Sequence, residues 1–210
     1  MKFLWFASVV FASIAVVPLE ATAAPVKDDA GHTLDLSRPV KRIISLAPSL
    51  TEMIYEAGGG DKLIGAVEYS DFPPVALKIP RIGSNQKLDL ELIANLKPDV
   101  AFVWYHGNAL REIERLGALG IPLFYLEPHA ISDIPGALER IGQLLGTDSV
   151  AKAAAQRFRA RHAALRAQYS DRTPVNVFYQ ISSKPLMTIN DQQIISDVIR
   201  LCGGRNVFGA

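Results

Sequence analysis

The chain has 210 residues, 20% of them charged, and a formal net charge of +1 at pH 7. A balanced surface of this kind gives no reason to expect nucleic acid or a membrane surface as the partner. The length suffices for one large domain or two small lobes with a buried core.

The first 23 residues are typical of a secretory signal peptide. Lys2 supplies a short positive region, and residues 3–17 form an apolar run interrupted only by serines. This run is shorter than the ~20 residues needed to span a bilayer, which disfavours the alternative of a membrane anchor. The small-x-small pattern before Ala24 marks the expected cleavage site. We therefore expect residues 1–23 to be removed on export.

Residues 24–146 alternate between strands and helices, and they are expected to form one α/β lobe. The strands are almost continuously apolar, as a parallel sheet covered on both faces requires. Ser49 and Glu52 have the spacing of a capping box, while Asp89 and Asn108 are expected to open helices. A hairpin is predicted over 25–40, strands over 43–46, 63–67, 100–104 and 122–126, and helices over 49–57, 89–96, 108–120 and 132–146.

A long helix is predicted within residues 147–172, because residues 149–169 contain no Gly or Pro and are rich in strong helix formers. A helix of that length spans about 30 Å and would join two lobes rigidly. Residues 173–210 hold too few elements to match the first lobe. We therefore predict an α/β fold of two Rossmann-like lobes joined by one long backbone helix, with the C-terminal lobe incomplete. The strands of the C-terminal lobe are expected over 175–180 and 186–189, and its helix over 193–202. The arginines of the long backbone helix are expected on its solvated face; these are Arg157, Arg159, Arg161 and Arg166.

Cys202 is the single cysteine. A lone thiol is unusual in an exported protein. It is either a small buried apolar group near a helix end, or its partner lies in sequence outside these residues.

The candidate site residues follow the predicted strands. Ligands of open α/β sheets bind beyond the carboxyl ends of the strands. Aromatic side chains at this edge suit a broad, flat, partly apolar ligand, although they could also simply plug the rim of the lobe. The residues placed there are Tyr69, Trp104, Tyr105 and His106, with Asn85 on a nearby loop.

Catalytic motifs such as a Gly-x-Ser-x-Gly elbow, a phosphate loop or His-Glu-x-x-His do not occur, so we do not expect an enzyme. The contrasting hypothesis is a metal-dependent enzyme or metallochaperone built on His106 and His129, with nearby carboxylates as oxygen ligands. These residues have no diagnostic spacing, and we expect neither a bound metal nor a cofactor.

Several segments resemble one family. Residues 39–52 (PVKRIISLAPSLTE) resemble the opening of the iron-siderophore and cobalamin family of periplasmic binding proteins, and residues 90–100 fit the same family. Residues 65–74 (GAVEYSDFPP) look like the matching segment of its vitamin B12-binding members. Residues 201–208 (LCGGRNVF) resemble the C-lobe pattern of the family. The resemblance covers residues 25–210.

This resemblance implies a periplasmic monomer that binds its ligand in the cleft between two lobes, with little hinge motion, and delivers it to the permease of an ABC importer. The implied ligand is cobalamin or another corrinoid, with a ferric siderophore or haem as the alternative. It implies that Tyr69 and Trp104 contact the corrinoid, whereas the Trp that close cobalamin binders can carry near Asn85 is missing. It further implies that Glu91 docks onto an Arg pocket of the permease, although an acid at a helix N-terminus is also ordinary dipole chemistry. More C-lobe contacts, a second docking Glu and a partner for Cys202 would be expected beyond these residues.

Overall fold

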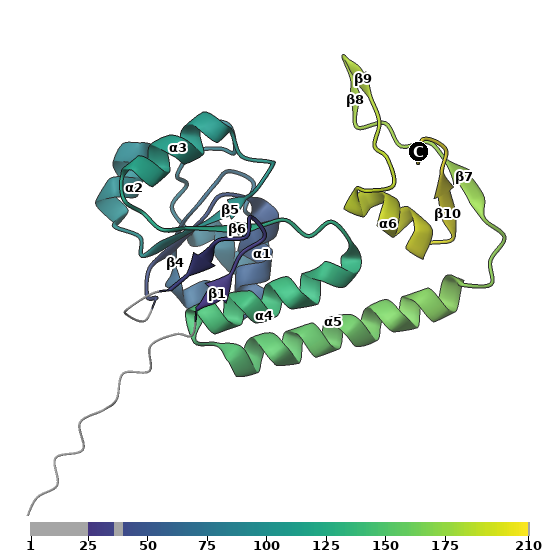
Figure 1. Cartoon of the computed structure of the whole chain (residues 1–210), viewed down its shortest axis with the longest axis horizontal. Coiled ribbons are helices and arrows are strands. Elements are labelled where there is room, and N and C mark those ends of the chain that lie inside the picture. Colours follow the sequence, from purple (N-terminus) through teal and green to yellow (C-terminus); the bar gives the residue numbers. More distant parts are fainter. Residues whose placement is uncertain (1–24, 36–39, 210) are drawn as a thin grey trace, which may run out of the picture.

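The structure, a computed structural model, describes residues 25–35 and 40–209. The predicted signal peptide and its cleavage site lie outside these residues. Figure 1 shows a larger N-terminal body and a smaller C-terminal body, bridged along one side by the long helix α5 (Asp148–Tyr169). We call the two bodies the N-lobe (residues 25–146) and the C-lobe (residues 173–209). Within the described residues, no helix is long and apolar enough to cross a membrane.

A four-stranded parallel sheet forms the centre of the N-lobe. Its strands lie in the order β4-β3-β5-β6. Nearly every residue of the two central strands is buried, so the reading of apolar strands as covered on both faces is confirmed. A short antiparallel hairpin, β1 (Val26–Lys27) with β2 (Thr33–Leu34), precedes the sheet as predicted. The sheet strands are β3 (Ile43–Ser45), β4 (Leu63–Ala66), β5 (Val100–Trp104) and β6 (Leu123–Leu126).

Helices cover both faces of this sheet. Successive strand side chains point to opposite faces, so Ile43 and Phe102 belong to one core cluster while Ile44 and Val103 belong to the other. The first cluster packs against α1, α4 and α5, and the second against α2 and α3. The helices are α1 (Pro48–Glu56), α2 (Leu90–Leu96), α3 (Leu110–Ala118) and α4 (Ile134–Leu145), with 3-10 turns η1 (Gly60–Lys62), η2 (Pro74–Lys78) and η3 (Ile131–Asp133).

The helix starts agree only in part with the sequence predictions. The predicted capping box at Ser49 is wrong: α1 begins at Pro48, after Ala47 in extended backbone, and no side chain caps it. A proline at the first helical position has its φ preset and lacks the N–H that would need a cap. Asn108 does not open α3, which begins two residues later. The Asp89 cap is confirmed, because its carboxylate accepts a hydrogen bond from the backbone N–H of Leu92 at 2.9 Å.

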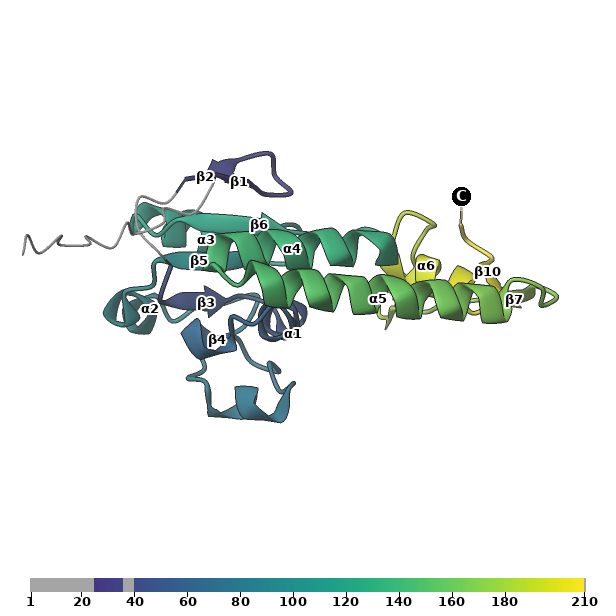
Figure 2. The ribbon, with the colours of Figure 1, turned by 90° about the horizontal axis from the view of Figure 1, so that it is seen from below.

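The long helix α5 is confirmed and lies beside α4 (Figure 2). Small side chains allow this close approach: the buried residues of α5 are Ala151, Ala154 and Ala155, and a Cβ at Gly142 of α4 would overlap Ala151. Only this short N-terminal stretch of α5 is buried, so the rest of the helix spans the gap between the lobes. The arginines predicted on a solvated face are exposed, and Arg159 forms an ion pair with Glu139 at 2.7 Å.

The C-lobe consists of one helix and two small sheets. Strand β7 (Val175–Val177) pairs in parallel with β10 (Gly204–Asn206), and α6 (Ile194–Leu201) connects to this sheet. The second sheet is the hairpin β8 (Ser182–Ser183) and β9 (Leu186–Met187), so both predicted C-lobe strands are shorter than expected.

Cys202 follows α6 and is exposed, so its interpretation as a buried apolar group is wrong. Cys202 is the residue that follows the last turn of α6, and it is exposed to solvent there. The pairing of Cys202 with a cysteine outside these residues stays a prediction.

Candidate ligand-binding site

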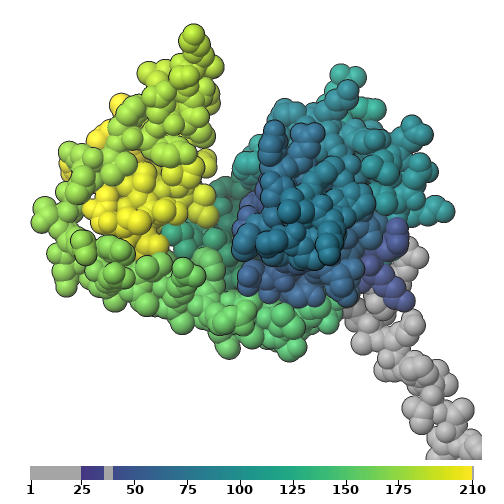
Figure 3. Space-filling model, turned by 180° about the vertical axis from the view of Figure 1, so that it is seen from behind, coloured from purple at the N-terminus to yellow at the C-terminus, as the bar shows by residue number. Residues whose placement is uncertain are grey.

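A cavity of about 730 Å³ lies between the two lobes, against α5. Figure 3 shows the molecule hollowed between the lobes. The volume falls within the range of roughly 300–1,000 Å³ that is usual for small-molecule sites. The cavity is lined by Ser49, Leu50, Glu52, Met53 and Glu56 of α1; Trp104, Leu126 and Pro128 at the ends of β5 and β6; Ile134 and Leu138 of α4; Ala154, Arg157, Phe158 and Arg161 of α5; and Ile194 of α6.

Trp104 is the predicted site residue that the structure brings to this cavity. It is the last residue of β5, and its side chain stays 41% exposed. The indole lies directly over Gly107, where a Cβ would overlap the ring. The buried Asn108 fixes this turn: its Oδ1 accepts a hydrogen bond from the N–H of Trp104 at 2.8 Å, and its Nδ2 donates one to the carbonyl oxygen of Leu46 at 2.7 Å. One side chain therefore ties the end of β5 to the connection that leads into α1.

Asn85 also lies at this turn, where it contacts backbone atoms. The side-chain Nδ2 of Asn85 donates a hydrogen bond to the backbone carbonyl oxygen of Gly107 at 3.3 Å. The backbone carbonyl oxygen of Asn85 accepts one from the N–H of Ala109 at 3.0 Å. The Asn85 side chain therefore supports the turn that carries Trp104.

Tyr69 lies on the rim of the N-lobe, and it is not among the residues that line the large cavity. Its backbone is left-handed, with φ of 65°, and its side chain is 80% exposed. The neighbouring Ser70 is buried and accepts a hydrogen bond from the hydroxyl of Thr51 at 3.1 Å, while its carbonyl oxygen accepts one from Arg81 at 2.9 Å. The loop is thus held in place while the tyrosine ring projects into solvent.

Tyr105 and His106 turn toward a second, smaller cavity of about 190 Å³, which Glu127 and His129 also line. The rings of Tyr105 and His106 are 4.3 Å apart between centroids, and His106 Nδ1 forms a hydrogen bond with Glu127 Oε2. Burial raises the pKa of the neighbouring Tyr125 above its ordinary value. The structure thus brings the two predicted histidines to one cavity. However, the described residues contain no group of three or more His, Cys, Asp or Glu side chains that could hold a metal ion.

Sequence reasoning missed most of the cavity wall. Phe158 is half-buried on α5, and the arginines on either side of it, Arg157 and Arg161, share its face. Arg157 approaches Glu56 of α1 to 3.8 Å. Their i, i+4 spacing puts the two arginines on one face of the helix, but which face looks inward depends on how α5 packs against α4. The result is an apolar cavity with both signs of charge at its border.

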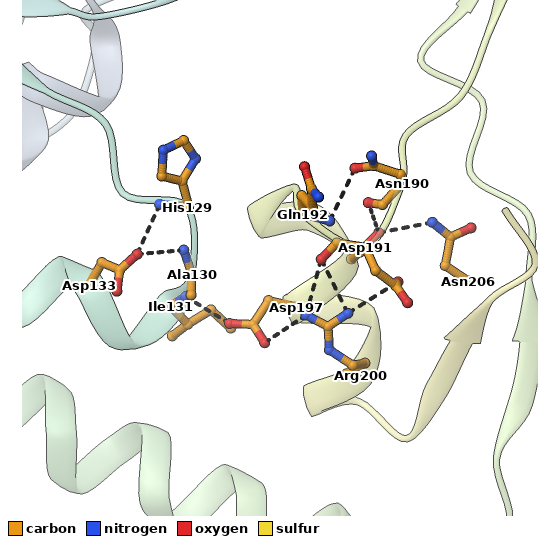
Figure 4. A network of polar contacts seen from close by, with 11 residues as sticks. His129, Ala130, Ile131, Asp133, Asn190, Asp191, Gln192, Asp197, Arg200 and Asn206 are labelled. Carbon is orange, nitrogen blue, oxygen red and sulfur yellow. Dashed lines mark hydrogen bonds and ion pairs between the residues drawn. The ribbon is translucent and has the colours of Figure 1, made fainter. Parts of the chain in front are cut away.

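A hydrogen bond joins the two lobes beside this cavity (Figure 4). Asp197 of α6 accepts a hydrogen bond from the N–H of Ile131, at the start of η3, at 2.8 Å. Asp133 accepts hydrogen bonds from the N–H groups of His129 and Ala130 at 3.0 and 2.9 Å. Two carboxylates, one from each lobe, therefore satisfy the free backbone donors before α4. Asp197 is itself held by Arg200 at 3.3 Å.

Glu91 is exposed in the first turn of α2, next to the capping Asp89.

Two α/β lobes joined by a single long helix, with a cavity between them, define the class of two-lobed substrate-binding proteins. The sequence supports this assignment directly, because residues 43–210 match the family described as periplasmic binding protein. The chain belongs to the periplasmic binding protein family.

Relatives with a stated ligand share a large part of the sequence. A vitamin B12-binding protein of Vibrio cholerae is 41% identical over 170 residues, which cover 81% of this chain and 62% of that protein. One of Photorhabdus laumondii is 42% identical over 167 residues, covering 80% of this chain and 61% of the relative. The chain therefore spans about 62% of the length of the curated relatives that it matches.

Solved structures of periplasmic binding proteins also resemble this chain. The crystal structure of the periplasmic vitamin B12 binding protein BtuF of Vibrio cholerae matches with a TM-score of 0.74 and 40% identity, over 81% of this chain and 67% of that one. The haem-binding protein RhuT from Roseiflexus sp. RS-1 matches with a TM-score of 0.70 over 81% of this chain and 66% of its own, at 23% identity. At that identity the likeness concerns the fold alone.

Proposed function

We propose that this protein captures cobalamin or a related corrinoid in the cavity between its lobes, in the periplasm, and delivers it to the permease of an ABC importer. The observation that carries the proposal is the exposed indole of Trp104 on the wall of a cavity of about 730 Å³, in a chain 41% identical to a vitamin B12-binding protein. The protein acts as a monomeric carrier and carries out no covalent chemistry on its ligand.

The chemistry of the cavity wall suits such a ligand. A corrinoid is a broad ring system whose edge carries many amide groups. Aromatic and thioether side chains contact its apolar surface, and Trp104, Phe158 and Met53 supply these. Amide oxygens accept hydrogen bonds from guanidinium groups and amide N–H groups donate to carboxylates, so Arg161 and Glu52 at the border offer both kinds of partner.

The other predicted contacts have distinct places in this proposal. Tyr69, on the exposed rim, contacts the part of the ligand that projects from the cavity. Tyr105 and His106 contact its edge from the neighbouring small cavity, while Asn85 acts through the turn that holds Trp104.

A calorimetric titration of the purified protein tests the proposal. Cyanocobalamin, a ferric siderophore and haem are each titrated under the same conditions, with and without a chelator of free metal ions. We expect saturable binding of the corrinoid, at one ligand per chain, that the chelator does not change. Saturable binding of the siderophore or haem alone would favour that ligand class, and binding abolished by the chelator would favour a bare metal site. An absence of corrinoid binding would contradict capture by these residues.

We also propose that Glu91 contacts an arginine of the permease. Its carboxylate is exposed at the start of α2 and is free to reach a partner protein. The substitution Glu91→Arg should leave corrinoid affinity unchanged and reduce uptake in cells that depend on this carrier. Glu114→Arg, an exposed glutamate on α3, is the matched control. Equal uptake by the wild type and the Glu91→Arg variant would refute the docking role.

A further inference from the structure

Resting on the proposed corrinoid function, we propose that Arg161 recognises the phosphodiester of a complete corrinoid, the anionic group that links the corrin ring to its nucleotide base. The inference names a class of cargo, because incomplete corrinoids such as cobinamide lack this group. It makes Arg161 a specificity-determining residue of the cavity between the lobes.

Arg161 belongs to the part of α5 that spans the gap between the lobes. The fully buried residues of α5 end at Ala155, and the helix then continues toward the C-lobe (Figure 1). Arg161 is exposed, and it lines the large cavity together with Phe158. Their i, i+3 spacing puts the guanidinium and the phenyl ring on one face of the helix. A ligand that rests on Phe158 is therefore within reach of the Arg161 guanidinium.

The arginines of α5 differ in what balances their charge. Arg157 and Arg159 form ion pairs with glutamates of α1 and α4, at 3.8 and 2.7 Å. Arg166 lines a different cavity, of about 510 Å³, that also borders α6. Within the described part of the chain, no carboxylate lies at ion-pair distance from Arg161. Of the two arginines that line the large cavity, Arg161 is therefore the one whose charge is left for a ligand.

The charges of the cavity wall match a ligand that carries both signs. Glu56 is balanced by Arg157, which leaves Glu52 and Arg161 without ion-pair partners among the described residues. In cyanocobalamin the cobalt centre with its corrin and cyanide is positive and the phosphodiester is negative, so the whole molecule is neutral.

The phosphodiester is the acceptor that suits Arg161 best. A guanidinium donates parallel N–H groups to two phosphate oxygens at once, and such charge-assisted hydrogen bonds are roughly twice as strong as neutral ones. The amide oxygens of the corrin accept hydrogen bonds from the same side chain, but they carry no charge. Loss of the positive charge at position 161 should therefore weaken the contact with the phosphodiester far more than a contact with an amide.

Calorimetric titration of the purified protein with cyanocobalamin and with dicyanocobinamide tests the proposal. Cobinamide keeps the corrin and its amides but lacks the phosphodiester and the base. Arg161→Gln removes the charge but keeps N–H donors for an amide oxygen. We expect this variant to raise the Kd for cyanocobalamin by about fivefold or more, the size of one solvent-exposed ionic contact, and the Kd for dicyanocobinamide by less than about twofold. Each variant is compared with the wild type on the same ligand, so the missing base cancels from the comparison.

Two further variants serve as controls. Arg161→Lys keeps the charge and should recover most of the lost cyanocobalamin affinity. Arg166→Gln removes an exposed arginine of the same helix that does not line the large cavity, so both Kd values should stay at the wild-type level.

Three results would overturn the phosphodiester role while leaving the corrinoid function intact. These are an unchanged Kd for cyanocobalamin in Arg161→Gln, an equal rise for both ligands, and a lysine variant as weak as the glutamine variant. Wild-type protein that binds neither ligand would overturn both proposals.

Discussion

Replacing Trp104 with alanine should weaken corrinoid binding by about thirtyfold. The indole is 41% exposed in the structure, and this exposed part is the surface that a ligand would cover. An aromatic side chain buries roughly 150–250 Å², so a ligand that covers the exposed part removes about 80 Å² from water. At about 25 cal/mol per Å² this burial contributes about 2 kcal/mol, which corresponds to about thirtyfold in Kd.

Calorimetry with cyanocobalamin on the wild type and the variant measures this difference. Leu119→Ala is the control, because Leu119 is 47% exposed but lies at the far end of α3 and does not line the cavity. Its Kd should stay within a factor of two of the wild type, and both variants should keep the wild-type circular dichroism spectrum. An unchanged Kd for Trp104→Ala would remove the indole from the site and refute the reasoning from exposed area.

Three further predictions follow from single contacts. In Gly107→Ala the added Cβ would overlap the indole of Trp104, so the ring should change its orientation while the fold is preserved. Calorimetry should then show weaker corrinoid binding. Unaltered affinity would show that the orientation of the indole does not matter. Asp197→Ala removes the hydrogen bond between Asp197 and the N–H of Ile131. The hydrogen-exchange rate of the Ile131 amide should then rise by up to about tenfold, for a loss of about 1.5 kcal/mol. Asp197→Asn keeps an acceptor oxygen, so it should raise this exchange rate less. The backbone N–H of Leu88 and the neighbouring Arg115 hold the pKa of Glu112 below its ordinary value of 4.5, so the ionised carboxylate stabilises the fold at neutral pH and this contribution is lost as the pH falls below that value. Denaturant titrations at several pH values should therefore show that Glu112→Gln loses less stability in acid than the wild type. An identical dependence of stability on pH in the two proteins would contradict the assignment.

The sequence predicted the layout of the N-lobe well, because its strands carry strong local signals. The apolar run at Val100–Trp104 is bounded by a proline and by a polar turn, so both its ends and its parallel pairing could be foreseen. The length of the first C-lobe strand was overestimated, because β7 leaves its sheet after Val177 although the sequence stays apolar.

The hydrogen-bond partners of polar side chains could not be predicted where the partner lies far away in the sequence. Asn108 resembles a helix cap in the sequence, but its amide binds the backbone of Leu46, which lies 62 residues away. Ser49 has the spacing of a cap, but it faces the cavity at the start of α1.

The candidate site was predicted in the same partial way. Trp104 was found because it ends a strand, and that rule holds for any parallel sheet. The contribution of Phe158 and its flanking arginines depends on the rotation of α5, which small residues on α4 and α5 determine through close packing. The interlobe contact of Asp197 depends on where α6 meets η3, and no local pattern indicates it.

The fluorescence of Trp104 tests the central claim, that the cavity between the lobes holds the corrinoid, most directly. The sequence contains two tryptophans, and Trp104 is the one outside the predicted signal peptide. Corrinoids absorb light in the region where tryptophan emits, so a corrinoid bound against this indole quenches it. Titration of the exported protein with cyanocobalamin, corrected with free tryptophan at the same corrinoid concentrations, should give saturable quenching that ends at one ligand per chain. Calorimetric binding with unchanged Trp104 emission would place the ligand elsewhere and contradict the account.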